Sequence, residues 1–259
     1  MFKRKKKFRN KTPENPHMLV NFEGSHNNSE LFNIFKEHQG RLYTKWVHYF
    51  EIYENYLKEY KNKEEIHILE IGIHRGGSLQ MWKKYFGPKA KIYGVDINPE
   101  CVNFEEDNIK VFIGDQSDRK FLRELVSKLP KLDIVIDDGG HSSLQQITSF
   151  EELYPHVKED GVYFVEDTHT NFWPKYQRGT RISFIDYSKK LVDKLHAWHF
   201  NEAPAMLRFS KPHKEREGNV EAPEFTRTTN SISFYDSMVV FKKKRKPEPY
   251  HCYSGKIKA

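Results

Sequence analysis

Apolar residues along this chain gather in short runs, and between the runs they recur every three or four positions. A short run bounded by polar residues is typical of a strand buried on both faces. Leu144, Ile147, Phe150 and Leu153 show the second pattern, which is typical of a helix with one apolar face. Strands that alternate with helices predict an α/β fold with a parallel sheet. The predicted strands cover residues 66–71, 91–95, 110–113, 134–136 and 162–165.

The remaining helices and the end of the chain complete this arrangement. Residues 227–234 and 237–241 are predicted to be two strands joined tightly around Tyr235 and Asp236, which is typical of an antiparallel hairpin. Residues 201–224, rich in proline and charge, are expected to form a long loop that is either mobile or a lid. The predicted fold class is a Rossmann-like, doubly wound sheet, mostly parallel, with a C-terminal antiparallel hairpin. The predicted helices cover residues 31–37, 43–60, 79–85, 118–129, 144–153 and 182–200.

Acidic pairs follow two neighbouring strands of the predicted sheet. Asp137 and Asp138 follow the fourth strand, and a histidine, His141, lies three residues further on. Glu166 and Asp167 follow the fifth strand. The carboxyl ends of parallel strands meet at one edge of a sheet, where ligands bind, and converging carboxylates repel one another unless a cation joins them. The pattern therefore predicts a divalent-metal site with a candidate base beside it.

A second interpretation of these acidic residues is structural. An aspartate at a strand end is often only the N-cap of the next helix, and Asp138 or Ser142 could cap the helix that begins near Ser143. For one aspartate alone, the cap is the better interpretation. Two acidic pairs and a histidine at the same sheet edge favour a functional site.

A glycine-rich turn joins the first predicted strand to its helix. It has the spacing Glu70-x-Gly72-x-x-x-Gly76-x-Ser78, which differs from G-x-G-x-x-G. Glycines let the backbone approach a ligand, and the helix N-terminus offers free N–H groups, as a nucleotide-like ligand requires. Asp96 ends the next strand, where it can bind ribose hydroxyls, and the third strand ends in Asp115 and Gln116, which can grip an adenine edge.

The helix predicted over residues 43–60 carries many aromatic side chains at helical spacing. Most of this stripe is expected to pack on the sheet as core. Four residues near the start of the helix are alternatively expected to line the entrance of a site. They are Lys45, Trp46, His48 and Tyr49.

Composition limits the classes of protein that fit. The 259 residues carry a formal charge of +7, but the basic residues are concentrated in blocks at 3–7 and 242–246, which weakens a nucleic-acid-binding interpretation. No apolar run approaches the roughly 18 residues needed to span a membrane. Cys101 and Cys252 are the only cysteines, so no disulfide framework is expected and a cytoplasmic location is predicted.

At these residues the chain resembles a known family. The Glu70-x-Gly72-x-x-x-Gly76 turn with Asp96 is similar to motifs of class I S-adenosylmethionine-dependent methyltransferases. The stretches Asp137–His141 (DDGGH) and Glu166–Trp173 (EDTHTNFW) resemble the metal-dependent sugar O-methyltransferases of the macrocin and mycinamicin type, and the cephalosporin-hydroxylase-like group shares the scaffold. The resemblance spans most of residues 43–242. It implies a methyltransferase domain at 63–246 after a basic, disordered tail at 1–28 and a helical cap at 29–62, with a C-terminal tail at 247–259.

The resemblance also implies roles for individual residues. Asp138, Glu166 and Asp167 would bind Mg²⁺ or Mn²⁺, and His141 would be the general base. The residues expected to surround S-adenosylmethionine are Glu70, Gly72, Gly76, Ser78, Asp96, Asp115, Gln116 and Asp137. The residues expected to contact the acceptor are Trp46, Tyr49, His169 and Trp173. Family members carry additions around the core that shape oligomer and acceptor pocket, and no large auxiliary domain is expected before this core.

The expected reaction is methyl transfer to a sugar hydroxyl, for example of rhamnose in a glycan or glycoside. A metal ion can polarise such a hydroxyl, and a histidine can accept its proton near neutral pH. The alternatives are an O-methyltransferase for small aromatic diols and, less favoured, an RNA methyltransferase or a non-catalytic scaffold. A sugar or glycan acceptor is the expected partner. No nucleic-acid partner and no membrane span are expected. A homo-oligomer such as a dimer is possible, and the sequence leaves the oligomeric state open.

Overall fold

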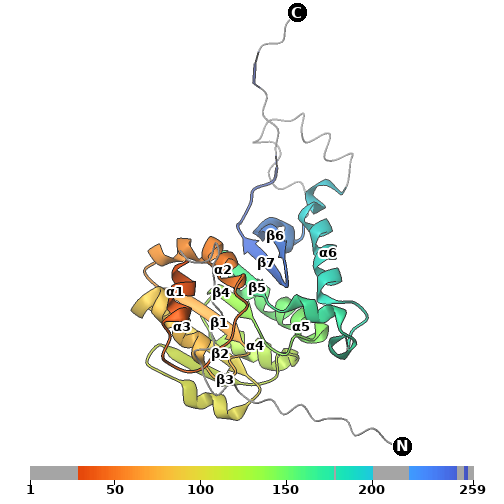
Figure 1. Ribbon diagram of the computed structural model, residues 1–259. Helices are drawn as coiled ribbons and strands as arrows, with labels where there is room; N and C mark the ends of the chain where they lie inside the picture. Colours follow the sequence, from red (N-terminus) through yellow and green to blue (C-terminus); the bar gives the residue numbers. More distant parts are fainter. Residues whose placement is uncertain (1–28, 178, 201–221, 250–253, 256–259) are drawn as a thin grey trace, which may run out of the picture.

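The computed structural model describes residues 29–177, 179–200, 222–249 and 254–255. The predicted basic tail at 1–28, most of the predicted loop at 201–224 and part of the C-terminal tail lie outside the described residues. Within the described part, helices and strands alternate along the chain as the apolar pattern predicted (Figure 1). In that part, no helix is long and apolar enough to cross a membrane.

Seven strands form one sheet in the order β3-β2-β1-β4-β5-β7-β6. The five strands from β1 to β5 pair in parallel, whereas β7 runs antiparallel to both β5 and β6. The fold class predicted from the sequence is therefore confirmed, including the C-terminal hairpin. The strands are β1 Ile66–Ile71, β2 Ala90–Asp96, β3 Ile109–Ile113, β4 Leu132–Asp137, β5 Val157–Val165, β6 Thr229–Tyr235 and β7 Met238–Lys243.

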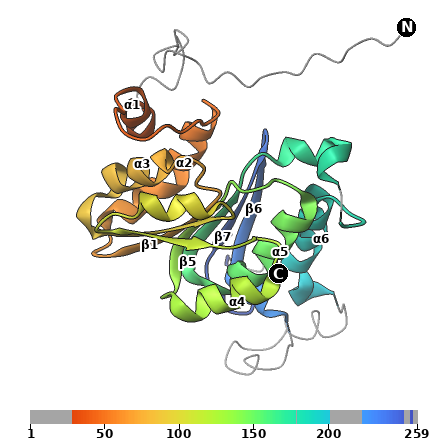
Figure 2. The same cartoon turned by 90° about the horizontal axis from the view of Figure 1, so that it is seen from below.

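Helices cover both faces of this sheet, with α1, α2 and α3 on one side and α4, α5 and α6 on the other (Figure 2). Each face has its own apolar core, and successive residues of a strand alternate between the two, so that Ile68 joins one core and Leu69 the other. Burial on both faces explains why the parallel strands are continuous apolar runs. The helices are α1 Glu30–Lys36, α2 Tyr49–Leu57, α3 Gly77–Phe86, α4 Arg119–Lys128, α5 Ser143–Leu153, α6 Phe184–Leu195 and α8 Glu224–Thr228.

The structure corrects the start of the second predicted helix. It was expected from residue 43, but α2 begins at Tyr49, and residues 42–46 run without regular structure. Arg41 fixes the beginning of this stretch, because Nε donates to the Gly76 carbonyl at 3.3 Å and Nη2 to the Phe104 carbonyl at 3.2 Å. These contacts with distant parts of the chain override the helical spacing of the aromatic residues. We call residues 41–46 the strap.

One further boundary differs from the expectation, whereas the cap of α5 is one of the two predicted candidates. The sixth helix, expected over 182–200, is divided into α6 and a separate 3₁₀ turn at Ala197–His199. At the start of α5, Ser142 is the N-cap and forms a capping box with Gln145. Because Ser142 caps this helix, the carboxylate of Asp138 is not needed as a cap and is available to the sheet edge.

The parallel strands bring the predicted site residues to one edge of the sheet. β1 ends before Gly72, β2 ends at Asp96, and β3 ends just before Asp115. β4 and β5 are neighbours, and Asp137 pairs with Val165 in register. The acidic pairs that follow these two strands therefore lie side by side.

Candidate active site

A cavity of about 680 Å³ opens at the carboxyl edge of the sheet, under the strap. The turns after all five parallel strands contribute to its wall, as does the strap. Of the site residues predicted from the sequence, ten line this cavity: Trp46, Gly72, Ser78, Asp96, Asp115, Gln116, Asp138, His141, Glu166 and Asp167. The other six lie behind or beside the lining: Tyr49, Glu70, Gly76, Asp137, His169 and Trp173.

Gly72 brings the turn after β1 against the loop after β4. Its φ is +84°, and its N–H donates to the carbonyl of Val95 at 2.7 Å. A Cβ atom at this position would stand 2.1 Å from the Asp138 carbonyl oxygen. Only glycine accommodates both the backbone conformation and this close approach, so the first glycine of the turn shapes the floor of the cavity.

Asp96 is held rigidly at the end of β2. Its Oδ2 accepts the N–H of His74 at 3.0 Å, and its Oδ1 accepts the N–H of Asn98 at 2.9 Å. At the end of β3, Asp115 Oδ1 accepts the N–H and the hydroxyl of Ser117, both at 2.7 Å. These carboxylates are thus oriented by the backbone around them at the places where the sequence predicted contacts with a nucleoside.

Gln116 fixes the loop that follows β4. Its Nε2 donates to Asp137 Oδ1 at 2.9 Å and to Ser149 Oγ at 3.0 Å, while its Oε1 accepts the N–H of Gly140 at 2.6 Å. Asp137 is buried, and burial raises the pKa of its carboxyl group to about 6. The structure therefore assigns Asp137 a supporting position beneath the cavity, where it orients the chain carrying Asp138.

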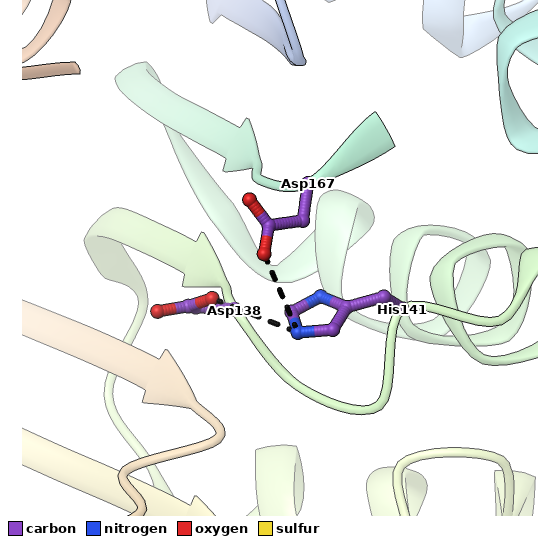
Figure 3. A group of neighbouring side chains, drawn as sticks. All are labelled: Asp138, His141 and Asp167. Atoms are coloured by element: carbon purple, nitrogen blue, oxygen red, sulfur yellow. Dashed lines mark ion pairs between the residues drawn. The ribbon is translucent and has the colours of Figure 1, made fainter. Parts of the chain in front are cut away.

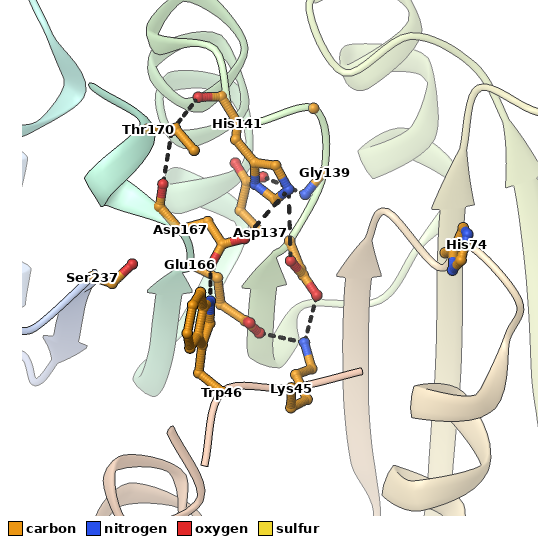
Figure 4. Close-up of polar contacts among 12 residues, drawn as sticks. Lys45, Trp46, His74, Asp137, Gly139, His141, Glu166, Asp167, Thr170 and Ser237 are labelled. Carbon is orange, nitrogen blue, oxygen red and sulfur yellow. Dashed lines mark hydrogen bonds and ion pairs between the residues drawn. The ribbon is translucent and has the colours of Figure 1, made fainter. Parts of the chain in front are cut away.

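Lys45 reaches the carboxylate cluster from one edge, where its nitrogen lies beside Glu166 (Figure 4). Its Nζ donates to Asp138 Oδ2 at 2.6 Å and to Glu166 Oε1 at 2.5 Å, and lies 3.6 Å from Glu70 Oε1. Burial opposes the charge of this lysine, but the three carboxylates outweigh it and raise the pKa of Lys45 well above its usual value. The hydroxyl of Tyr53 donates to the same oxygen of Glu166.

Asp138, His141 and Asp167 form the open side of the cluster (Figure 3). His141 Nε2 lies 3.7 Å from Asp167 Oδ2 and 4.0 Å from Asp138 Oδ1. One ligand atom from each of these residues falls within 4.8 Å of the others, which is a spacing that can hold a metal ion. Glu166 lies behind Asp138, on the buried side of the cluster.

Both Asp167 and His141 have positive φ angles, 52° and 58°. The hydroxyl of Thr170 lies 2.9 Å from the His141 carbonyl and 2.7 Å from that of Asp167, so it links the two backbones. On the side chain of Asp167, Oδ1 accepts the hydroxyl of Tyr49 at 2.9 Å and the indole N–H of Trp46 at 3.0 Å. Tyr49 was expected at the site entrance, but it is fully buried and supports Asp167 from behind.

Exposed aromatic rings border the open side of the cluster. Trp46 and Trp173 are 54% and 50% exposed, and both make edge contacts with the ring of His169, at 5.9 and 4.9 Å between centroids. His169 Nδ1 in turn contacts the hydroxyl of Ser237 on the β6–β7 turn. The rings form a ridge beside Asp167, and of the three only Trp46 also lines the cavity.

The cluster meets the chemical requirements of a hard divalent cation. Each of the three acidic residues has one oxygen bound by a protein donor. The second oxygen of each accepts no hydrogen bond from the described residues. Free carboxylate oxygens from adjacent strand ends are the ligands that Mg²⁺ prefers. These second oxygens are Asp138 Oδ1, Glu166 Oε2 and Asp167 Oδ2.

Several residues of the site carried little signal in the sequence. Lys45 was considered only as an entrance residue, and Tyr53 only as part of an aromatic stripe. Each reaches Glu166 across more than a hundred residues of chain. His74 acts through its own backbone N–H, and the hydroxyl of Thr170 binds backbone carbonyls, so no side-chain motif reveals either contact. The stretch Thr44-Lys45-Trp46 was a hint that Lys45 belongs to the site, because it lies within the part of the chain that resembles the methyltransferase family.

No protein-family model matches the chain. Among curated proteins, it is similar to demethylmacrocin O-methyltransferase of Streptomyces fradiae, with 42% identity over 169 residues, 60% of this chain and 42% of that protein. It is also similar to 8-demethyl-8-alpha-L-rhamnosyl tetracenomycin-C 2'-O-methyltransferase of Streptomyces olivaceus, with 34% identity over 213 residues, 77% of this chain and 52% of that protein. The chain spans about half the length of these curated relatives.

Among solved structures, the chain is similar to the methyltransferase MycE from the mycinamycin biosynthetic pathway, in complex with Mg, SAH and mycinamycin VI. The TM-score is 0.68 and the sequence identity 27%, and the match covers 86% of this chain and 55% of that chain. The cavity and the carboxylate cluster described above therefore lie within a shared methyltransferase fold.

Proposed function

We propose that this chain, which belongs to the family of class I sugar O-methyltransferases that includes those relatives, transfers a methyl group from S-adenosylmethionine to a sugar hydroxyl with the help of a divalent metal ion. One observation carries the proposal. A cavity whose wall carries Gly72, Asp96 and Asp115 at three strand ends opens onto a carboxylate cluster at the two neighbouring strand ends. Cofactor and metal would then meet where the acceptor hydroxyl enters.

In this proposal the cofactor occupies the part of the cavity between Gly72, Asp96 and Asp115. Gly72 has no side chain, so a ligand can approach its backbone closely. The two carboxylate oxygens of Asp96 are held in place and can accept hydrogen bonds from ribose hydroxyls. The cofactor supplies an activated sulfonium methyl group. What the chain must add is the alignment of the acceptor oxygen with that methyl group.

Asp138, Glu166 and Asp167 would hold Mg²⁺ or Mn²⁺ through their free oxygens. A bound divalent cation supplies Lewis-acid polarisation of the acceptor hydroxyl and a template for two adjacent hydroxyls. The chain's own residues set the geometry: Tyr49 and Trp46 orient Asp167, and Lys45 orients Asp138 and Glu166.

His141 would be the general base. Its Nε2 faces the open side of the cluster, within 4 Å of both aspartates, and can accept the proton of a hydroxyl brought there. The hydroxyl of Thr170 binds the carbonyl of His141, and this contact helps to fix the backbone from which the imidazole projects. His169 is the second candidate, at the foot of the aromatic ridge.

The ridge of Trp46, His169 and Trp173 suits two classes of acceptor. Exposed aromatic faces stack on the apolar face of a sugar ring as well as on flat aromatic diols. The named sugar substrates of the relatives support the sugar. A rhamnose-type deoxysugar of a glycoside is the proposed acceptor, and a small aromatic diol is the second candidate. A cytoplasmic setting and the absence of a nucleic-acid partner are parts of the proposal that rest on the sequence alone, and the oligomeric state stays open.

Methyl transfer from labelled S-adenosylmethionine into a panel of acceptors tests this function. The panel contains rhamnosides, other deoxysugar glycosides, catechol and a short RNA, each with and without Mg²⁺. We expect Mg²⁺-dependent labelling of a glycoside. Labelling of catechol alone would move the function to the aromatic diols, and labelling of RNA alone would overturn the proposal.

A further inference from the structure

The ammonium group of Lys45 is buried where three carboxylates converge. The side chain is 2% exposed, and its nitrogen lies 2.6 Å from Asp138, 2.5 Å from Glu166 and 3.6 Å from Glu70. Oε1 of Glu70 is buried without a hydrogen bond, so this lysine is its nearest positive charge in the described chain. A charge removed from water to this degree persists only when it is paired.

The strap holds Lys45 from both ends. At its start, Arg41 is bound to the Gly76 and Phe104 carbonyls and pairs with Glu106 at 2.8 Å. Immediately after Lys45, the indole of Trp46 donates to Asp167. The backbone of Lys45 is therefore tied to the glycine turn after β1 on one side and to the carboxylate cluster on the other.

Lys45 divides the oxygens of the cluster into two groups. It takes Oδ2 of Asp138 and Oε1 of Glu166, which are the oxygens on the buried side. Oδ1 of Asp138 stays on the open side with His141 and Asp167. The ammonium group of Lys45 thus holds both carboxylates from the buried side of the cluster.

We propose that Lys45 is a positioning residue of the metal site, whose ammonium group stays bound to Asp138 and Glu166 when a divalent ion binds and keeps their other oxygens directed at the ion. This inference rests on the proposed function, because it concerns the same metal site. It adds a fixed positive charge to the three carboxylates, so that the bound ion and Lys45 share them.

The rival account gives Lys45 the opposite role. In it, the ammonium group only fills the place of the ion and is displaced when the ion arrives. The two accounts differ in sign. Loss of a positioning group weakens metal binding, typically about 10- to 100-fold for a partner behind a ligand. Loss of a competitor for the same place strengthens binding.

The first test follows Lys45 itself in the unaltered chain. A buried, hydrogen-bonded ammonium group exchanges its protons slowly and gives a ¹⁵N-coupled proton signal, which is assigned by its absence in Lys45→Met. We expect this signal to be present both without Mg²⁺ and at saturating Mg²⁺, with a different chemical shift in the two conditions. Disappearance of the signal on titration with Mg²⁺, to the fast exchange of a solvated lysine, would show displacement and overturn the proposal.

The second test measures Mn²⁺ affinity by calorimetry, without cofactor or acceptor. Lys45→Met should bind Mn²⁺ about 10- to 100-fold more weakly than the unaltered chain. Lys58→Met is the matched control, since Lys58 is exposed at the end of α2, and it should bind Mn²⁺ normally. In Lys45→Ala, n-propylammonium restores the missing atoms of the side chain and should recover part of the affinity.

The outcomes separate this inference from the proposed function. Unchanged or tighter Mn²⁺ binding by Lys45→Met overturns the positioning role and leaves metal-dependent methyl transfer intact. No Mn²⁺ binding by the unaltered chain overturns both. If Lys45→Met does not fold, Lys45→Arg, which keeps the positive charge but has no ammonium group, assigns the signal instead, and the behaviour of that signal in the unaltered chain during the Mg²⁺ titration decides.

Discussion

The imidazole of His141 stands 3.7 Å from the carboxylate of Asp167, measured from Nε2 to Oδ2. The two residues come from different strand ends, and both have backbones in the left-handed region that most side chains avoid. Thr170 bridges their carbonyl groups and so maintains a conformation that would otherwise relax. Strain held in this way is typical of residues whose side chains must point at one place.

Replacing His141 with alanine should lower turnover about 100- to 10,000-fold, the usual effect of removing a general base. Binding of Mn²⁺ and of S-adenosylhomocysteine should change little, because the carboxylates and the cofactor turn are left in place. Steady-state kinetics with calorimetry on the same preparation separates the two effects. His169→Ala is the matched variant: if it loses the larger part of turnover while His141→Ala keeps it, the base is His169.

Tyr49→Phe removes the hydroxyl that orients Asp167. Two groups lose a partner: the carbonyl of Ser237 and the N–H of Asp167, which donates to this hydroxyl at 3.1 Å. We expect Mn²⁺ affinity to fall by roughly tenfold or more and the free energy of unfolding to fall by about 1–3 kcal/mol. Tyr56→Phe, whose hydroxyl contacts Ser233 away from the cluster, should leave Mn²⁺ affinity unchanged. Equal metal affinities in both variants would contradict the role of Tyr49.

Asp96→Ala should weaken binding of S-adenosylhomocysteine by about 1–3 kcal/mol, the loss of a charged acceptor for a polar ligand. The reason is the fixed orientation of this carboxylate by the N–H groups of His74 and Asn98. Calorimetry measures the change, and Asp107→Ala, at an exposed position beyond the cavity, is the control. Tight binding of NAD with no response to S-adenosylhomocysteine would refute the cofactor assignment.

Because of Lys243, the free energy of unfolding is expected to change with pH in the alkaline range. Its side chain donates to the carbonyls of Tyr154 and Val157, but burial lowers its pKa to about 8, from 10.5. Between these pH values the unfolded chain holds more protons on this lysine than the folded chain does, so the free energy of unfolding rises with pH. Relative to Lys243→Met, the unaltered chain should gain up to about 3 kcal/mol between pH 8 and 10.5, at about 1.4 kcal/mol per pKa unit.

Urea unfolding at a series of pH values measures this gain. Lys244→Met, at an exposed neighbouring position, should run parallel to the unaltered chain. A constant difference between Lys243→Met and the unaltered chain across this range would mean that the lysine is not perturbed.

The parallel strands and the position of the site could be predicted because both are local features of the sequence. A strand such as β4 is an apolar run that ends in Asp137, and the parallel order of neighbouring strands places Asp138 and Glu166 together. The glycine turn could also be predicted. The positive φ of Gly72 and its close approach to Asp138 require glycine at this position, and that requirement is visible in the sequence.

The inner side of the site could not be predicted, because it depends on contacts between distant residues. Lys45 is separated from Asp138 by 93 positions and from Glu166 by 121. The sequence placed Lys45 only at the entrance of a site and named no partner for it, and its helical surroundings suggested the wrong backbone. The start of α2 at Tyr49 follows from the anchoring of Arg41 and Trp46, which only the folded chain provides.

Methyl transfer to the best glycoside acceptor, first in excess EDTA and then after the addition of Mg²⁺, tests the central claim most directly. The three carboxylates converge with free oxygens that only a cation can join, so turnover should be abolished by the chelator and restored by Mg²⁺ or Mn²⁺. Asp138→Asn should fail to recover under the same conditions. Full turnover in excess EDTA would contradict the account.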